Sequence, residues 1–183
     1  IWMKRRYESQ AKRSLLALRA SPATASSLRP RLRMVSIIPG IEARDPERTV
    51  DAAPEYKYKD IYLYANGKPQ ELDGAYAVDP THPAVEAMMK KTSGLFHRAG
   101  FEYVKMDFMT HGAMEADKWY NPEITTGIQG YNYGMKLLNQ YFGDMYINLS
   151  ISPVFPAQYA QSRRIACDAW NQIKDTEYTL NAL

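Results

Sequence analysis

The sequence predicts an α/β fold with a parallel β-sheet, on two observations. From residue 79 onward, β-prone segments alternate with segments whose apolar residues recur at helical spacing. The order is strand, helix, strand, helix, strand, which is typical of parallel sheets with helical crossovers. In addition, charged residues lie at the ends of two expected strands, although strands covered on both faces normally carry none.

Length and composition fit one globular domain or part of a larger one. The chain has 183 residues, of which 45% are hydrophobic and 23% charged. No run approaches 18 apolar residues, so we expect no membrane-spanning helix. The single cysteine, Cys167, excludes an internal disulfide framework. Because the chain starts at Ile1 and ends without a helix cap or polar tail, we expect a fragment of a longer protein.

The net charge of +3 is divided unevenly along the chain. Residues 1–35 contain nine Lys or Arg and one acid, whereas residues 36–183 are mildly acidic. We treat residues 1–35 as a basic segment of uncertain status: an amphipathic surface helix over 2–20 with a loop over 21–33, a transit peptide, or a nucleic-acid arm. It has no interleaved aromatics and no repeated basic motif, so we expect no nucleic-acid partner.

Before residue 79 the expected elements are short. Residues 34–38 form a β-prone run, and the charged residues 44–60 lack periodicity and suggest an exposed loop. Residues 61–64 followed by Asn66 and Gly67 predict a hairpin, because these two residue types favour the tight turn.

From residue 79 the pattern is clearer. Thr81 is expected to cap a helix, Pro83 fits its first turn, and Gly100 ends it. The remaining expected elements are strands over 101–108, 145–151 and 164–168 and helices over 126–141 and 159–162.

The charged residues at the strand ends are the candidates for chemistry. Lys105 and Asp107 are two residues apart, so their side chains share one face of the strand. A cation there would keep Asp107 ionised, as a nucleophile requires. Arg164 and Asp168 lie at the end of a later strand. Two such aspartates could flank one scissile bond as nucleophile and proton donor. The alternative is an ordinary ion pair at each strand end.

Three motifs resemble the α-galactosidase clan, glycoside hydrolase families 27 and 36. Residues 100–108, GFEYVKMDF, resemble the clan's G-F-x-Y-V-K-x-D-F segment. Residues 164–170, RIACDAW, resemble its second motif, an Arg four residues before an Asp. Residues 79–83 match the segment that opens the helix before the first motif. The motifs occur in the family's order, and the resemblance covers roughly residues 54–183.

The resemblance implies a (β/α)8 TIM barrel, which needs about 250 residues. Residues 36–183 would supply about strands three to six of it, with an insertion at about 44–78. Residues 38–41 would be a remnant of the preceding barrel strand. A partial barrel exposes sheet edges that could pair with another chain, so an oligomer is an alternative to a monomer. We expect this chain alone to be inactive, although its parent would be a glycosidase.

The family's mechanism is retaining hydrolysis of terminal α-galactosides. By the resemblance, Asp107 would be the nucleophile that forms the β-galactosyl enzyme. Asp168 would be the general acid and then the general base. Lys105 and Arg164 would hold sugar hydroxyls. The two carboxyl groups should lie about 5–5.5 Å apart, as in retaining enzymes generally.

Five further residues are weaker candidates for substrate binding. Ser150 and Ser152 lie where the family places sugar-contacting groups, although a turn hydroxyl is an equal alternative. Trp119 and its neighbour Tyr120 could stack on a sugar or pack in a loop. His111 follows Asp107 closely enough to reach the site.

We expect no cofactor and no metal. The three histidines lack the spacing of metal ligands, Cys167 suits an inert core thiol, and no glycine-rich phosphate loop is present. The expected partner is an α-galactoside oligosaccharide or glycoconjugate, with no membrane. Alternatives are an α-N-acetylgalactosaminidase, an α-glucan-directed relative, or a non-catalytic carbohydrate-binding barrel. The localisation is open, with the periplasm or secretion preferred to the cytoplasm.

Overall fold

The structure is a computed structural model that describes residues 40–42, 45–72, 75–150, 152–153, 157–164, 172–174 and 176–177. The predictions for residues 1–38 therefore lie outside the described residues, including the helix over 2–20. So do Cys167 and the predicted acid Asp168.

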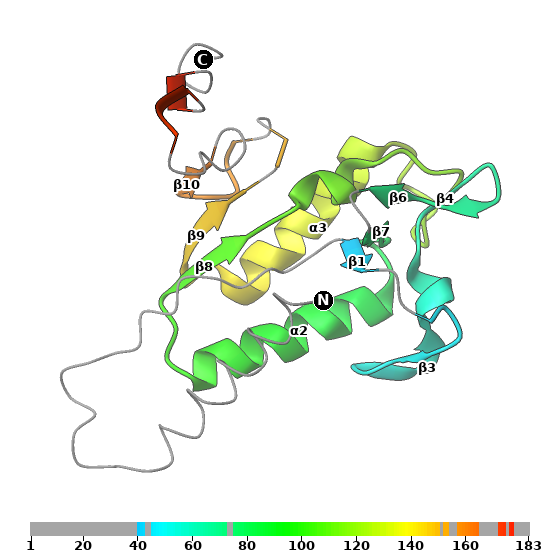
Figure 1. The fold of residues 1–183 in the computed structure, drawn as a ribbon. Helices are drawn as coiled ribbons and strands as arrows, with labels where there is room; N and C mark the ends of the chain where they lie inside the picture. Colours follow the sequence, from blue (N-terminus) through cyan, green and yellow to red (C-terminus); the bar gives the residue numbers. More distant parts are fainter. Residues whose placement is uncertain are drawn as a thin grey trace.

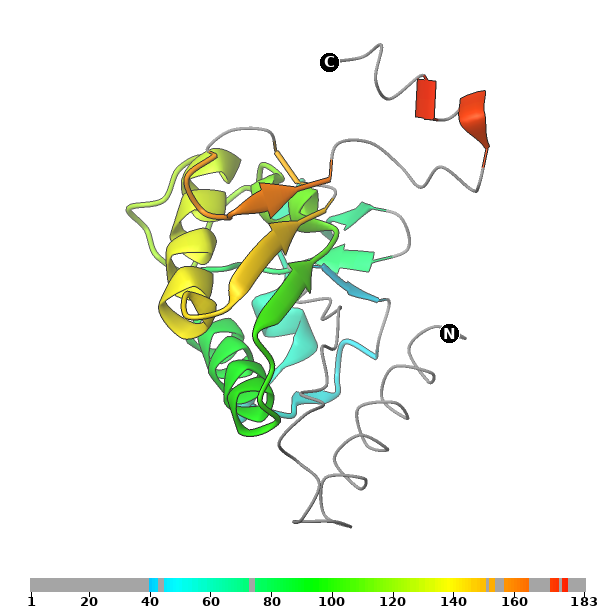
Figure 2. The same cartoon turned by 90° about the vertical axis from the view of Figure 1, so that its left-hand side faces the viewer.

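Three strands form the predicted parallel sheet. They are β8 (Tyr103–Met106), β9 (Tyr146–Leu149) and β10 (Ser162–Arg163), in the order β10-β9-β8. Figure 2 shows them side by side, with both long helices on one side of the sheet. The predicted alternation of long helices and strands is confirmed from α2 (Pro83–Arg98) to β9. The last strand starts two residues earlier than predicted, because β10 pairs with β9 from Ser162 onward.

Helix α2 (Pro83–Arg98) forms where the sequence predicts it, but Thr81 is not its cap. The capping residue is His82, whose Nδ1 accepts a hydrogen bond from the backbone N–H two residues on, at 3.2 Å. The Thr81 hydroxyl instead donates to Asp79 Oδ1 at 2.7 Å. After the helix, Gly100 has φ 74°, which glycine adopts without steric cost.

Helix α3 (Gly127–Phe142) confirms the second predicted helix. The Thr126 hydroxyl accepts from the Gln129 N–H, and the Gln129 side-chain oxygen accepts from the Thr126 N–H. This reciprocal capping box satisfies N–H groups that the helix itself leaves unpaired. Within the helix, Gly134 permits close packing, because a Cβ there would lie 2.8 Å from Pro80 Cβ.

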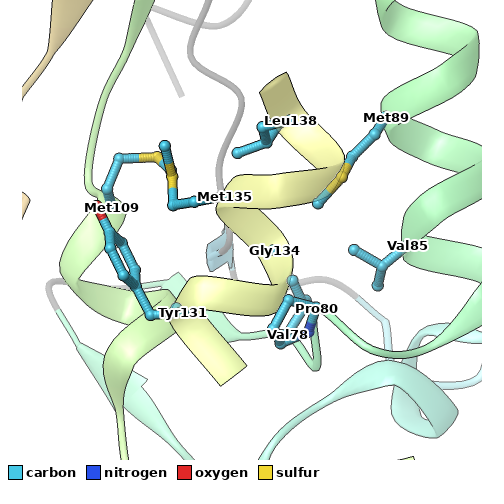
Figure 3. Close-up of a pocket in the computed structure, with 10 residues that line it drawn as sticks. Val78, Pro80, Val85, Met89, Met109, Tyr131, Gly134, Met135 and Leu138 are labelled. Carbon is cyan, nitrogen blue, oxygen red and sulfur yellow. The ribbon is translucent and has the colours of Figure 1, made fainter. Parts of the chain in front are cut away.

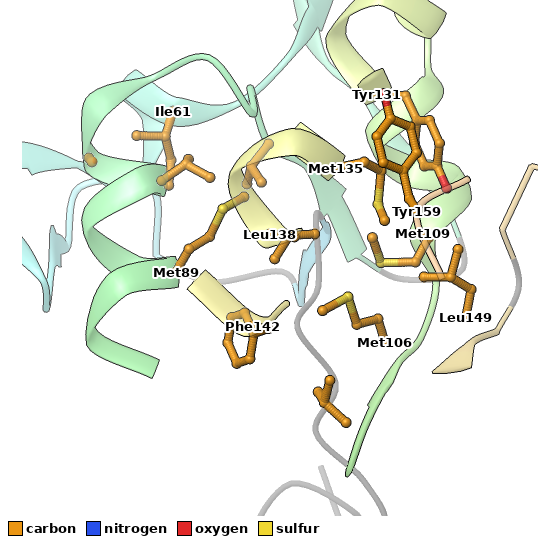
Figure 4. Packing of buried hydrophobic residues seen from close by; sticks show 14 of the residues in the cluster. Ile61, Met89, Met106, Met109, Tyr131, Met135, Leu138, Phe142, Leu149 and Tyr159 are labelled. Carbon is orange, nitrogen blue, oxygen red and sulfur yellow. The ribbon is translucent and has the colours of Figure 1, made fainter. Parts of the chain in front are cut away.

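The hydrophobic core lies between these two helices and one face of the parallel sheet (Figure 4). Side chains at every second strand position point into it and are 0% exposed: Val104, Met106, Ile147 and Leu149. The helices contribute Met89 from α2 and Met135, Leu138 and Phe142 from α3. This period of two is what orients the intervening strand residues toward the opposite face.

Residues 45–61 are more ordered than the exposed loop that we predicted for 44–60. Strand β2 (Thr49–Val50) pairs with β3 (Ala53–Lys57), and a 3-10 helix, η1 (Tyr58–Ile61), follows. The prediction failed because the pairs are short and only Val50, Ala53, Tyr58 and Ile61 are buried, which leaves no periodicity to detect.

The predicted hairpin is confirmed as β4 (Tyr64–Ala65) and β5 (Lys68–Pro69). Its turn residues Asn66 and Gly67 have φ of 52° and 71°, as a tight hairpin turn requires.

A second small sheet has the order β1-β7-β6, with β1 (Gly40–Glu42), β6 (Glu71–Leu72) and β7 (Ala75–Ala77), all antiparallel. In Figure 1 it lies beyond the end of β8. The interpretation of residues 38–41 as a remnant of a parallel barrel strand is therefore wrong for the part that is described, because β1 pairs antiparallel with β7.

The short helix predicted over 159–162 is also wrong. Residues 158–159 form a turn, and β10 begins at Ser162. Across the described residues, the parallel strands number three and do not close into a barrel. Within that same part of the chain, no helix is long and apolar enough to cross a membrane.

Candidate active site

The parallel sheet brings three of the predicted residues to one edge. Beyond β8 and β9 the hydrogen-bond ladder continues, because the Ser150 N–H donates to Met106 O and the Arg164 N–H to Leu149 O, both at 2.8 Å. Asp107, Ser150 and Arg164 therefore follow the C-terminal ends of three adjacent strands. This is the edge at which parallel α/β barrels place their active sites.

Asp107 and Lys105 form an ion pair. Lys105 Nζ lies 2.8 Å from Asp107 Oδ2, and the two side chains are only 16% and 15% exposed. The other carboxylate oxygen, Oδ1, accepts the Phe108 N–H at 3.1 Å. The prediction that both side chains share one face is confirmed, and each carboxylate oxygen has its own donor.

The pKa of Asp107 lies below the ordinary value of an aspartate. Burial is the largest single influence, and it raises the pKa because it penalises the charged form. The Lys105 ammonium, the Ser150 hydroxyl and the Phe108 N–H act in the opposite direction and together outweigh burial. Asp107 is therefore ionised at neutral pH, the state in which a carboxylate can act as a nucleophile.

Two serines follow β9 at the same edge. Ser150 is fully buried, and its hydroxyl is close enough to lower the pKa of Asp107 but makes no hydrogen bond of normal geometry. The Ser152 hydroxyl likewise has no such partner among the described residues. Buried hydroxyls normally have partners, so these two are unsatisfied groups in the described part of the chain. Their role in sugar binding stays a prediction.

A second polar row lies one layer below this edge. Lys105, Asn148 and Ser162 are register partners across the three strands, and Asn148 Nδ2 donates to Ser162 Oγ at 2.5 Å. Asn148 was not among the residues predicted from the sequence. Its signal was a polar residue between Ile147 and Leu149, two apolar residues that point to the core.

Arg164 directly follows β10 and is half-buried, which places it at the predicted edge. Its neighbour Arg163 donates from Nη1 to Pro153 O at 2.6 Å and ties the segment after β9 to β10. Asp168 lies outside the described residues. Its role as the acid and its separation from Asp107 therefore stay predictions.

His111 is placed differently from the prediction. Its ring is 0% exposed, with Nδ1 2.9 Å from Phe108 O and Nε2 2.7 Å from Leu72 O. Both nitrogens are thus engaged with backbone carbonyls, and neither is left for a sugar hydroxyl. His111 therefore connects two segments of the chain in this structure, and its contact with a substrate stays a prediction that this placement does not favour.

Trp119 also turns away from solvent. It is 7% exposed and packs with Leu63 and Ala77, which is the packing alternative, and its stacking on a sugar stays a prediction. Its neighbour Tyr120 is 58% exposed, with its ring against His82 at a centroid distance of 4.7 Å.

The cavity drawn in Figure 3 is separate from this edge. It encloses about 20 Å³ between α2, α3 and the segment after β8, and it is lined by apolar side chains such as Val85, Met89 and Met135. With no polar partners, a space of this size is expected to stay dry. Across the described part of the chain, no three His, Cys, Asp or Glu residues gather as metal ligands would.

Comparisons with known proteins give matches at the level of three-dimensional structure. No family model and no curated protein matches the chain. An α-galactosidase from Thermus thermophilus in complex with stachyose matches with a TM-score of 0.50 and 20% identity, covering 72% of this chain and 30% of that one. An isomalto-dextranase from Arthrobacter globiformis T6 has a TM-score of 0.48 and 20% identity, covering 74% and 25% of the two chains.

The α-galactosidase match supports the resemblance that the three motifs suggested. At 20% identity it concerns the fold, and the chain spans under a third of that enzyme's length. The described residues are therefore similar in fold to part of an α-galactosidase, a glycoside hydrolase.

Proposed function

We propose that this chain carries the catalytic edge of a retaining glycoside hydrolase that cleaves terminal α-D-galactosides. The observation that supports this most is the Lys105–Asp107 pair at the C-terminal end of β8, which holds a shielded yet ionised carboxylate. Ser150 and Arg164 follow the two adjacent strands at the same edge. A merely structural ion pair would need no such neighbours.

The proposed reaction has two steps. In the first, an Asp107 carboxylate oxygen bonds to the anomeric carbon while the bond to the leaving oxygen breaks, and that oxygen takes the proton of Asp168. In the second, water attacks the anomeric carbon as the ester bond between that carbon and Asp107 breaks, and the water gives a proton to the Asp168 carboxylate. This step restores the Asp107 carboxylate and the protonated Asp168, and the two displacements together retain the α configuration.

Lys105 serves this reaction in two ways. Its ammonium favours the charged form of Asp107 before attack. Its remaining N–H groups, together with the Arg164 guanidinium and the serine hydroxyls, would hold sugar hydroxyls next to the reacting carbon. No cofactor is needed for this chemistry.

We further propose that β8, β9 and β10 are consecutive strands of a larger (β/α)8 barrel, within about strands three to six. The match to an α-galactosidase over 30% of its length supports this. On this proposal the isolated chain has no turnover, because the missing strands supply the rest of the sugar site.

The test compares the isolated chain with the complete polypeptide that contains it, on an aryl α-galactoside. The complete polypeptide should release the aryl group, and NMR should show the α anomer of galactose as the first product. A first-formed β anomer would contradict retention. Robust turnover by the isolated chain would contradict the need for the rest of the barrel.

A substrate screen separates the alternatives. Preference for aryl α-N-acetylgalactosaminides or α-glucosides would contradict the proposed galactoside specificity and leave the proposed mechanism in place. Binding of α-galactosides without hydrolysis of any of the three substrates would favour a carbohydrate-binding module over an enzyme.

A further inference from the structure

Phe108, the residue after Asp107, has an unusual backbone. Its φ is 55° and its ψ is 37°, a left-handed conformation that is costly for a residue with a Cβ. In this conformation its N–H donates to Asp107 Oδ1 at 3.1 Å. A costly conformation persists only where surrounding contacts hold it.

The contact that holds Phe108 comes from His111. The carbonyl oxygen of Phe108 lies 2.9 Å from His111 Nδ1 and also accepts the His111 backbone N–H at 3.4 Å. The peptide groups on both sides of the Phe108 Cα are therefore fixed, one by Asp107 and the other by His111.

His111 is itself anchored at its far side. Nε2 lies 2.7 Å from Leu72 O in β6, and the ring is 0% exposed within the 3-10 helix η2 (Met109–Ala113). In Figure 1 the chain leaves β8 toward the small sheet that contains β6 and β7. Since carbonyl oxygens only accept, the ring donates from both nitrogens when it is doubly protonated and from one when it is neutral.

We propose that His111 is a positioning residue for Asp107, acting through Phe108. By holding the Phe108 carbonyl, it keeps the left-handed conformation that directs the Phe108 N–H to Oδ1, while Lys105 holds Oδ2. The carboxylate is then fixed between two donors and presents a defined oxygen lone pair to the substrate. The catalytic role of this contact rests on the proposed function, because it takes Asp107 as the nucleophile. The hydrogen-bond geometry itself does not depend on that function.

Two conservative substitutions separate the two contacts of the ring. In His111→Asn, the amide nitrogen can occupy the position of Nδ1 and still donate to Phe108 O. In His111→Gln, the amide can reach the position of Nε2 and donate to Leu72 O instead. A positioning role through Phe108 predicts that Asn preserves the environment of Asp107 and that Gln does not, whereas a purely structural role predicts no such order.

The readout is the titration of the Asp107 side-chain carboxyl carbon by 13C NMR in the 183-residue chain. The signal is assigned by its disappearance in Asp107→Asn. We expect the midpoint in His111→Asn to match that of the unaltered chain and the midpoint in His111→Gln to move upward, because the Phe108 N–H lowers the pKa of Asp107. Leu138→Ala, a core substitution in α3, is the control for destabilisation and should leave the midpoint unchanged.

Three results would overturn the proposal: an unchanged midpoint in His111→Gln, equal shifts in both His111 variants, or an equal shift in Leu138→Ala. If the His111 variants fail to fold, the partly exposed Phe108 gives a second pair. Phe108→Gly accepts a positive φ and should keep the midpoint, whereas the β-branched Phe108→Val should raise it. Equal midpoints in this pair would also overturn the proposal.

In the complete polypeptide, His111→Gln should lower kcat by about tenfold or more with little change in KM. The reason is that a misplaced nucleophile loses transition-state stabilisation but has little effect on substrate binding. The titration does not depend on turnover. If the titration succeeds but no glycoside is cleaved, the proposed function fails and the positioning geometry stands. If glycosides are cleaved but the titration fails, the reverse holds.

Discussion

The two faces of the parallel sheet differ in nearly every property, although they come from the same strands. Toward the helices, Val104, Met106, Ile147 and Leu149 are completely buried and apolar. Toward the other side, Lys105 and Asn148 form a polar row, and Asp107 continues that side just beyond the strand. One face thus stabilises the sheet, and the other uses the rigidity that results to hold charged groups in place.

The largest expected effect concerns the polar face. In the complete polypeptide, Asp107→Asn should lower kcat by at least about 10³-fold, because an amide is a poor nucleophile and the first step needs a covalent bond. Steady-state assays on an aryl α-galactoside measure this. The exposed Asp117→Asn is the matched control and should retain full activity; near-normal turnover in Asp107→Asn would remove it as nucleophile.

The second effect concerns the buried face. Leu149→Ala should lower the free energy of unfolding by about 2–5 kcal/mol, because it removes a fully buried side chain and leaves a cavity. The adjacent Asn148→Ala should cost only about 0.5–1.5 kcal/mol, the usual value of one hydrogen bond. Urea denaturation of both variants gives the comparison. Equal losses would show that the two faces do not differ as described.

A third prediction tests how tightly the helices lie on that face. Gly134→Ala should destabilise the chain by about 1–3 kcal/mol, because its Cβ would lie 2.8 Å from the Cβ of the rigid Pro80. Gly94→Ala in α2 should instead stabilise it by about 0.5–1 kcal/mol, since its Cβ would meet only the flexible end of Arg98. Thermal unfolding distinguishes the two, and changes of the same sign would contradict the packing.

A fourth prediction concerns pH. The pKa of Asp107 is lowered in the folded state, so its contribution to stability is present above its unfolded pKa and is lost as the pH falls through the folded value. In Lys105→Met the pKa of Asp107 should rise, because the ammonium that lowers it is gone while burial still raises it. The variant should therefore lose less stability than the unaltered chain between neutral and acid pH. Parallel curves in urea titrations at each pH would contradict this.

The smallest expected effect lies outside both faces. His97 and Asp144 form an ion pair at 2.8 Å with side chains 39% and 65% exposed. The hydrogen bond with Asp144 raises the pKa of His97. The contribution of this pair to stability is therefore present below the unfolded pKa of His97 and is lost as the pH rises through its folded pKa. Because solvent screens the pair, Asp144→Asn should cost less than about 0.5 kcal/mol, and added salt should reduce the difference.

The sequence predicted the features that depend on local chemistry. Both long helices and the strands β8 and β9 follow from periodicity, and the Lys105–Asp107 pair follows from alternation along one strand. The positions that failed depend on tertiary contacts. His82 replaces Thr81 as a cap because the Thr81 hydroxyl is already donating to Asp79, and His111 is buried because Leu72, 39 residues away, supplies a carbonyl. No pattern within one segment reveals such pairings.

Asp107, at the C-terminal edge of the sheet, is the proposed nucleophile. The most direct measurement is covalent trapping of the complete polypeptide with a galactose-configured cyclophellitol aziridine, followed by proteolysis and mass spectrometry. We expect one equivalent of label, attached to Asp107, and no label in Asp107→Asn. Label on another carboxylate, or undiminished labelling of Asp107→Asn, would contradict it.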